Sequence, residues 1–216
     1  METSWLETSL LLCSLASALV YGLLVRAPPS RPRMAYKAAS TALLSLVAAA
    51  QDSSSLLVAA LALGSAGDAF LAWPGDVAFL RGLGSFLVAH VLYSVLLCRV
   101  GGGIAALGAG DWRCLMAAVA VASALAMILA LVPKVGPSLR FPIVCYCIVI
   151  LCMLLGAVTV PGRQVAAGAV LFASSDSLLA ADEFLVDAQS EHRAWMQYAV
   201  WILYYLGQLL IVIGFR

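Results

Sequence analysis

Charged residues are scarce in this chain: they make up 11% of its 216 residues, and the net charge is only +1. A soluble globular protein carries about 25% charged residues, so this composition excludes an ordinary soluble domain. Without a basic excess, the electrostatic surface that attracts nucleic acid is missing as well. We therefore expect no nucleic-acid partner.

Histidine and the common catalytic motifs are also scarce. His90 and His192 are the only histidines, so the three-histidine ligand set of a zinc hydrolase cannot form. The chain has no phosphate-binding loop or dinucleotide fingerprint, and no Gly-x-Ser-x-Gly elbow. Its six cysteines fall in or beside apolar runs, where free thiols are the expected state. We expect neither a metal nor a cofactor.

Long apolar runs are what the sequence has in abundance, with 64% hydrophobic residues. A helix needs about 20 apolar residues to cross a bilayer, so the chain has room for about eight spans and short loops. The alternating pattern of a transmembrane barrel is absent. We expect an all-α integral membrane protein with a single transmembrane domain over residues 1–216. The expected spans are residues 5–25, 34–50, 54–73, 78–98, 113–132, 141–160, 164–181 and 194–215.

Small residues suggest local structure around the fifth span. A glycine-rich link is expected before it, formed by Gly101, Gly102, Gly103, Gly108 and Gly110. The span itself carries alanine at every fourth position: 118, 122, 126 and 130. A stripe of small residues lets a second helix approach closely, so we expect this face to pack against a neighbouring helix.

Basic residues predict the orientation in the membrane, because loops rich in lysine and arginine stay in the cytoplasm. The odd-numbered loops hold more of them than the even-numbered loops and the C-terminus. Those in the odd-numbered loops are Arg26, Arg31, Arg33, Lys37, Arg81, Lys134, Arg140 and Arg193, against Arg99, Arg113, Arg163 and Arg216 elsewhere. We expect a multi-pass protein of a bacterial inner membrane or a eukaryotic endomembrane, with both termini on the non-cytoplasmic side.

Few ionisable side chains lie inside the spans, and such groups mark functional sites by default because they are costly in lipid. They are Asp68, His90 and Asp176. Each acid lies about five residues, or about 8 Å, from the expected cytoplasmic end of its span. Further polar side chains at comparable positions are Lys37, Tyr93, Tyr146, Tyr204, Tyr205 and Gln208. We expect one shared pocket in the cytoplasmic half of the bundle.

Helical spacing supports this convergence. One face of the fourth span carries Phe86, His90 and Tyr93, and one face of the eighth carries Trp201, Tyr204, Tyr205 and Gln208. Structural roles stay open: a buried acid can cap a helix or bond a tyrosine, and Lys37 can extend to the headgroups. The acidic turn after the seventh span is expected at the surface; its residues are Asp182, Glu183, Asp187, Glu191 and His192.

A weak internal similarity relates the two halves of the chain. The segment 67–72 (GDAFLA) resembles 175–180 (SDSLLA), and the two acids are separated by half the chain length. This suggests a parallel repeat of four plus four spans, with both acids at one depth.

These residues together resemble the signature of the YhhN-like lysoplasmalogenase family. The matching strings are Gly67-Asp68-x-x-Leu71 with Trp73-Pro74, Phe86-x-x-Ala89-His90-x-x-Tyr93, Tyr146 with Met153, Gly168-Ala169-x-x-Phe172-x-x-Ser175-Asp176-x-x-Leu179-Ala180, and Tyr204-Tyr205-x-x-Gln208-x-x-Ile211. Lys37 resembles the family lysine that opens the second span, and Ser40 stands where a proline is often found. Five strings occur in order, at the expected spans.

The resemblance implies an enzyme that hydrolyses the vinyl ether bond of lysoplasmalogens, releasing a fatty aldehyde and glycerophospho-ethanolamine or -choline. Vinyl ethers open by acid, which requires one protonated carboxyl and one carboxylate. Two carboxyl groups in one poorly hydrated site do not both ionise near neutral pH. The resemblance therefore makes Asp68 and Asp176 the catalytic pair, with the assignment of acid and base left open.

Further roles follow from the same resemblance. His90 is the third expected catalytic residue, and it and Tyr205 are expected to orient water. Lys37 is expected to hold the phosphate of a lysophospholipid substrate. The remaining expected substrate-binding residues are Tyr93, Tyr146, Ser175, Tyr204 and Gln208. Two alternatives stay open: a proton- or ion-coupled transporter, which also uses intramembrane acids, and a lipid-binding membrane protein without catalysis.

Overall fold

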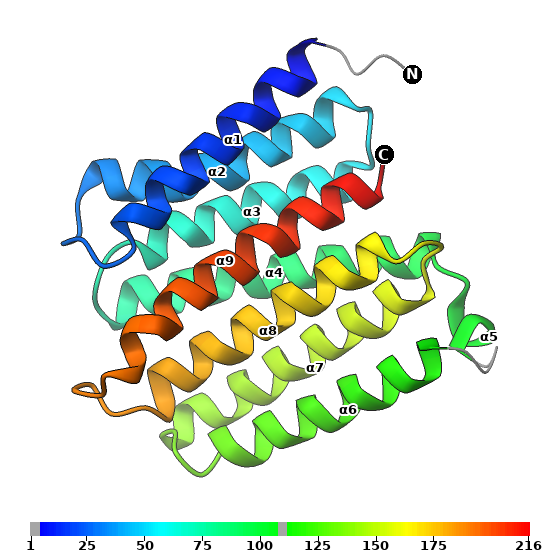
Figure 1. The fold of residues 1–216 in the computed structure, drawn as a ribbon. Coiled ribbons are helices and arrows are strands. Elements are labelled where there is room, and N and C mark those ends of the chain that lie inside the picture. The colour runs from blue at the N-terminus through cyan, green and yellow to red at the C-terminus, as the bar shows by residue number, and fades with distance from the viewer. Residues whose placement is uncertain (1–4, 108–111) are drawn as a thin grey trace. The chain divides into compact units, whose positions relative to one another are not determined.

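The structure, a computed structural model, describes residues 5–107 and 112–216, and the elements in these ranges are all helices (Figure 1). They are α1 (Trp5–Leu24), α2 (Arg31–Ala50), α3 (Ser55–Leu71), α4 (Asp76–Val100), α5 (Gly103–Leu107), α6 (Trp112–Leu131), α7 (Pro137–Thr159), α8 (Gln164–Phe184) and α9 (His192–Gly214). All except α5 have between 17 and 25 residues. The predicted all-α membrane fold is confirmed, and the eight long helices in these ranges are roughly consistent with the predicted count of about eight spans.

Six helices of the described part are long and apolar enough to cross a membrane: α1, α4, α6, α7, α8 and α9. The other two long helices fall short for separate reasons. The apolar helix α3 has only 17 residues, and α2 carries Arg31, Arg33 and Lys37 in its first two turns. The chain is thus a multi-pass membrane protein, and the orientation of its termini stays a prediction.

Local sequence explains where several helices begin. Ser30 precedes α2 in an extended conformation, and its hydroxyl accepts a hydrogen bond from the Arg33 N–H at 3.4 Å. Pro32 stands in the first turn, where a missing N–H costs nothing. Gly162, with φ of +85°, turns the chain ahead of α8 in a conformation that side chains disfavour.

The link between α4 and α6 differs from the prediction. Gly103 adopts a φ of +60° and begins the short helix α5, so part of the expected link is helical. Gly101 lies so close to Thr159 that a Cβ atom there would collide with its hydroxyl. Gly108 and Gly110 lie outside the described residues.

The helices divide into two compact units. The first contains residues up to Leu96 together with 212–216, and the second contains Leu97–Ile211. The single domain and the repeat of four plus four spans both stay predictions.

In the first unit, α2 packs between α1 and α3. The α2–α3 contact buries Leu44, Val47, Leu57 and Leu61 completely. Serine hydroxyls on these helices donate to backbone carbonyls of their neighbours: Ser14 to Ser40, Ser45 to Val58 and Ser65 to Ala38. Such polar contacts between helices add to van der Waals packing where lipid removes the hydrophobic drive.

In the second unit, α7 contacts both α6 and α8. Helices α8 and α9 cross at two glycines: a Cβ on Gly168 would lie 2.7 Å from the Gly207 carbonyl oxygen, and one on Gly207 would lie 2.8 Å from that of Gly168. The expected packing of the alanine stripe is wrong. Residues 118, 122 and 126 of α6 are exposed in the structure, so this part of the face is not packed against another helix of the described chain.

The expectation of a surface turn after the seventh span is wrong in part. Helix α8 continues through Asp182 and Glu183 to Phe184. Asp182 is buried, and its Oδ1 lies 3.1 Å from Nε of Arg193 in an ion pair that compensates for lost hydration. Glu183 belongs to the helix but is exposed. The other residues of the predicted turn, Asp187, Glu191 and His192, follow α8 and are exposed as predicted.

Candidate functional site

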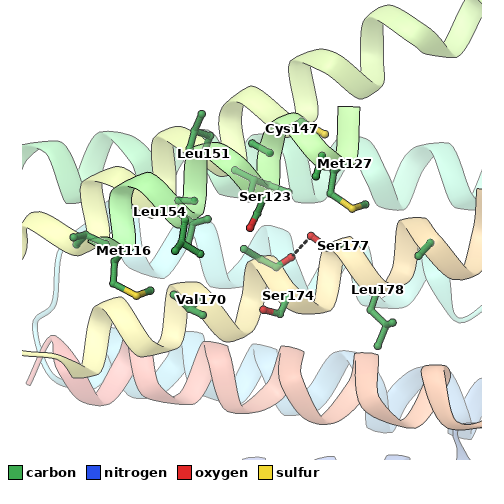
Figure 2. A pocket seen from close by; sticks show the side chains of 18 residues that line it. Met116, Ser123, Met127, Cys147, Leu151, Leu154, Val170, Ser174, Ser177 and Leu178 are labelled. Atoms are coloured by element: carbon green, nitrogen blue, oxygen red, sulfur yellow. Dashed lines mark hydrogen bonds between the residues drawn. The ribbon is translucent and has the colours of Figure 1, made fainter. Parts of the chain in front are cut away.

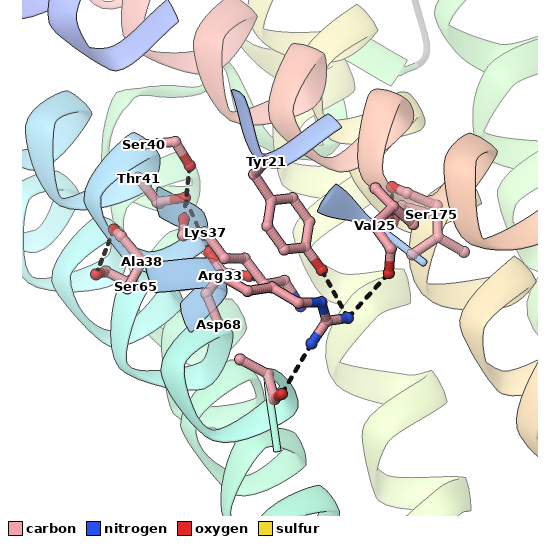
Figure 3. Close-up of polar contacts among 12 residues, drawn as sticks. Tyr21, Val25, Arg33, Lys37, Ala38, Ser40, Thr41, Ser65, Asp68 and Ser175 are labelled. Carbon is pink, nitrogen blue, oxygen red and sulfur yellow. Dashed lines mark hydrogen bonds and ion pairs between the residues drawn. The ribbon is translucent and has the colours of Figure 1, made fainter. Parts of the chain in front are cut away.

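The first unit holds a buried acid with a positive partner (Figure 3). Asp68, on the last turn of α3, is 1% exposed, and its Oδ1 lies 3.6 Å from Nζ of Lys37. Thr41, one turn after Lys37 on α2, donates its hydroxyl hydrogen to Oδ2 of Asp68 at 2.9 Å. One carboxylate oxygen therefore lies beside a cation, and the other accepts a hydrogen bond from a hydroxyl.

Arg33 extends this positive region toward the helix ends. Its guanidinium donates to the carbonyls of Leu24 at 3.1 Å, Val25 at 3.0 Å and Ala72 at 2.8 Å. These groups lie at the ends of α1 and α3, where carbonyls lack helical partners and a cation is favoured. The Tyr21 ring lies 5.5 Å from the Arg33 guanidinium and 5.7 Å from Nζ of Lys37, a cation–π arrangement with both.

Helix α4 presents its predicted polar face to the interior. His90 and Tyr93 are completely buried, and Phe86 is nearly so, which confirms that this face is a buried one. The Phe86 ring packs against Gly67, where a Cβ atom would lie 2.7 Å from the ring. Because Gly67 immediately precedes Asp68, the glycine lets α4 approach α3 beside the acid.

The second unit holds the other acid. Asp176 lies on α8, and Tyr146 of α7 donates its phenolic hydrogen to Oδ2 of Asp176 at 2.9 Å. Both side chains are partly buried. The predicted convergence of Tyr146 with an acid is therefore found, and it joins α7 to α8. Tyr146 is a neutral donor to Asp176, whereas Lys37 beside Asp68 is a cation.

The predicted polar face of α9 is also buried. Trp201, Tyr204, Tyr205 and Gln208 are all 5% exposed or less. The Tyr204 ring packs edge-on against Phe172 of α8, with centroids 5.4 Å apart. Ser175, expected to bind substrate, donates its hydroxyl hydrogen to the Val200 carbonyl at 2.9 Å, so it ties α8 to α9.

The two acids lie at different distances from their helix ends. Asp68 is three residues before the end of α3, and Asp176 is eight before the end of α8. At about 1.5 Å per residue these distances are about 5 Å and about 12 Å. The two predicted depths were equal because the seventh span was predicted to end at residue 181. Since the acids belong to different units, the shared pocket stays a prediction.

A cavity of about 550 Å³ lies among α6, α7 and α8 within the second unit (Figure 2). Its lining is mostly apolar and contains no charged side chain, with hydroxyls from Ser123, Ser174 and Ser177. None of the predicted site residues lines it, but Cys147 and Ser177, which directly follow Tyr146 and Asp176, both do. The cavity thus reaches the same level along α7 and α8 as the Tyr146–Asp176 hydrogen bond, although neither of these two residues lines it.

The described residues contain no group of three or more histidine, cysteine, aspartate or glutamate side chains that could hold a metal ion. The six cysteines have free thiols.

The model of the YhhN family matches residues 32–215. This range includes Asp68 and Asp176 and excludes Tyr21. The chain belongs to the YhhN family. A relative from Mycobacterium bovis named lysoplasmalogenase is 33% identical over 192 residues, which cover 84% of this chain and 69% of the relative. The human protein named lysoplasmalogenase TMEM86B is 31% identical over 159 residues, 74% of this chain and 62% of that protein. No solved structure matches the chain. The resemblance found from the motifs is therefore confirmed.

Three residues around Lys37 and Asp68 were not predicted as site residues from the sequence: Tyr21, Arg33 and Thr41. Thr41 carried a readable signal, because it lies four residues after Lys37 and so shares its helix face. Arg33 was counted only for orientation. Tyr21 gave no signal, because its contacts depend on how α1 packs against α2.

Proposed function

We propose that this chain is a lysoplasmalogenase, which hydrolyses the vinyl ether bond of 1-alkenyl lysophospholipids to a fatty aldehyde and a glycerophospho-alcohol. The observation that carries the proposal is the buried Asp68 carboxylate, contacted by Lys37 at 3.6 Å and Thr41 at 2.9 Å. Membership of the YhhN family and the names of the relatives support the same reaction. The headgroup is ethanolamine or choline.

The chemistry calls for one acid and one base. A carboxylic acid gives its proton to the vinyl carbon β to oxygen, which produces an oxocarbenium ion. A carboxylate removes a proton from water as the water oxygen bonds to this cation, giving a hemiacetal. The group that began as the acid, now a carboxylate, then takes the hemiacetal hydroxyl proton. The group that began as the base, now protonated, gives its proton to the departing glycerol oxygen. The aldehyde is released, and both groups return to their starting states.

Asp68 suits the role of the base. The Lys37 ammonium and the Thr41 hydroxyl both face its carboxylate oxygens, and a carboxylate is the group that removes a proton from water and steadies a nearby cation. Lys37 is therefore assigned to holding Asp68 ionised. This differs from a lysine reserved for the substrate phosphate, because its ammonium already has a carboxylate partner inside the protein.

Asp176 then takes the role of the acid. The hydrogen bond that Tyr146 donates to Oδ2 orients the Asp176 carboxyl. His90 and Tyr205, both buried, are assigned to orienting water. Three further buried side chains, Tyr93, Tyr204 and Gln208, are assigned to substrate contact together with Ser175.

The test is mass spectrometry of the purified protein incubated with 1-alkenyl lysophosphatidylethanolamine and, separately, with its saturated 1-alkyl analogue. Aldehyde from the alkenyl lipid alone is expected. Asp68→Asn and Asp176→Asn are each expected to lower kcat by about 10²- to 10⁴-fold. Asp187→Asn, in the exposed turn after α8, is the matched control and retains wild-type turnover.

Two outcomes would overturn the proposal. Folded wild-type protein that cleaves neither lipid, but carries a solute or protons across liposomes, would favour the transporter. Asp68→Asn and Asp176→Asn proteins with full activity would show that hydrolysis occurs without these acids.

We also propose that both termini lie on the non-cytoplasmic side, from the excess of basic residues in the odd-numbered loops. A fluorescent protein that matures only in the cytoplasm, fused after Arg216, is expected to stay dark. Bright fusions would reverse the assignment.

A further inference from the structure

We propose that the cavity among α6, α7 and α8 holds the alkenyl chain of the lysolipid and sets the chain length that the enzyme accepts. The inference rests on the proposed function and adds a binding site to it. The cavity measures about 550 Å³, within the range of about 300–1,000 Å³ typical of small-molecule sites.

The lining suits a hydrocarbon chain and excludes a headgroup. Methionine, valine, leucine, isoleucine and alanine make up most of it, and no charged side chain contributes. A zwitterionic headgroup would lose its hydration there without any ionic partner. The Ser177 hydroxyl, on the cavity wall, donates to the Ala173 carbonyl at 2.8 Å in its own helix (Figure 2), so this hydroxyl is already satisfied without a polar ligand.

The shape also fits a single chain. The cavity follows α8 from Val170 to Ala181, which corresponds to about 16 Å along the helix. Figure 2 shows Met116 and Val170 toward one end and Met127, Cys147 and Leu178 toward the other. An elongated apolar space of this kind matches one extended chain, which is what a lysolipid has.

One end of the cavity lies at the level of the proposed acid along α7 and α8. Cys147 and Ser177 line the cavity, and each directly follows one partner of the Tyr146–Asp176 hydrogen bond. A chain in the cavity would bring its first carbons toward this end and its terminal methyl toward Met116. The reacting double bond joins the first two carbons of the chain, so this orientation brings the bond to the level of Asp176 along α8.

The experiment fills the far end of the cavity. Ala120 of α6 is buried and lines the cavity, whereas Ala122 of the same helix is exposed and does not. Ala120→Phe is expected to lower kcat/KM for an 18-carbon alkenyl chain by about tenfold or more. For a 10-carbon chain the value stays within twofold of wild type. Ala122→Phe, with the same added volume, leaves both values unchanged. An unchanged chain-length profile in folded Ala120→Phe protein would overturn the inference.

A second measurement is independent of turnover and of the fold of the variant. Wild-type protein is irradiated with a saturated 1-alkyl lysophosphatidylethanolamine that carries a diazirine on its terminal carbon, and labelled peptides are mapped. Labelling concentrated near Met116 and Val170 supports the inference. Labelling spread evenly over exposed lipid-facing residues such as Leu129 and Ile202 opposes it.

The two measurements separate this inference from the proposed function. If alkenyl lipid is not cleaved but the diazirine labels the cavity, the chain-binding site stands and the hydrolase assignment fails. If alkenyl lipid is cleaved but the cavity is unlabelled and Ala120→Phe has a wild-type profile, the hydrolase stands and the chain site fails.

Discussion

Replacing Lys37 by methionine tests how Asp68 is held in the membrane. The substitution keeps most of the side-chain volume but removes the charge 3.6 Å from a carboxylate that is 1% exposed. At an effective dielectric constant of about 20, the attraction between unit charges at that separation is about 5 kcal/mol. Removing one partner of a buried ion pair costs about 3–5 kcal/mol, because the other charge stays buried alone.

A double-mutant cycle separates the pairwise interaction from other effects of the two substitutions. We expect Lys37→Met to lower the free energy of unfolding by about 3 kcal/mol. Asp68→Asn should cost less, about 1–2 kcal/mol, because the amide oxygen still accepts from Thr41 and Lys37, 12% exposed, can rotate toward water. The double variant should recover part of the sum, with a coupling energy of about 2 kcal/mol.

The assay is equilibrium unfolding in mixed detergent and dodecyl sulfate, followed by circular dichroism for the wild type, both single variants and the double variant. A coupling energy below about 0.5 kcal/mol, the level of additivity expected for independent sites, would refute the ion pair as the element that holds Asp68. The assignment of Asp68 as the base would then lose its physical support.

Two further predictions concern the second unit. Tyr146→Phe keeps the ring but removes the hydroxyl that donates to Asp176 at 2.9 Å. We expect kcat to fall about 10- to 100-fold with little change in KM. A normal kcat would contradict the role of this hydrogen bond. Gly168→Ala places a methyl group 2.7 Å from the Gly207 carbonyl oxygen and should lower the free energy of unfolding by about 1–3 kcal/mol. Gly84→Ala, whose Cβ would meet nothing within 4 Å, is the matched control, and equal stability of the two variants would contradict the tight helix crossing.

The apolar runs were enough to place the helices, because a continuous helix satisfies the backbone hydrogen bonds that lipid cannot. The fifth span was expected at residues 113–132 and α6 is Trp112–Leu131. The errors fell where helices extend beyond their apolar runs. Helix α8 continues through Asp182, because Arg193 compensates the charge that hydropathy counted as a break.

Side-chain convergence was predictable where it depends on spacing along one helix. The face of α4 with His90 and Tyr93, and that of α9 with Tyr204 and Gln208, follow from the helical period and are buried. The stripe on α6 shows the limit of this reasoning. Alanine spacing marks a face that permits close packing, but Ala122 is exposed because no sequence pattern states where the partner helix lies.

The sequence by itself thus determined the helical membrane fold, the family and the two candidate acids, since these depend on local hydropathy and on residue identity. Only the tertiary structure decided that Lys37 and Thr41 hold Asp68, and that Tyr146 donates to Asp176. It also decided that an apolar cavity lies among α6, α7 and α8. The physical reason is that such contacts depend on the rotation and spacing of packed helices, which result from the fit of many side chains at once.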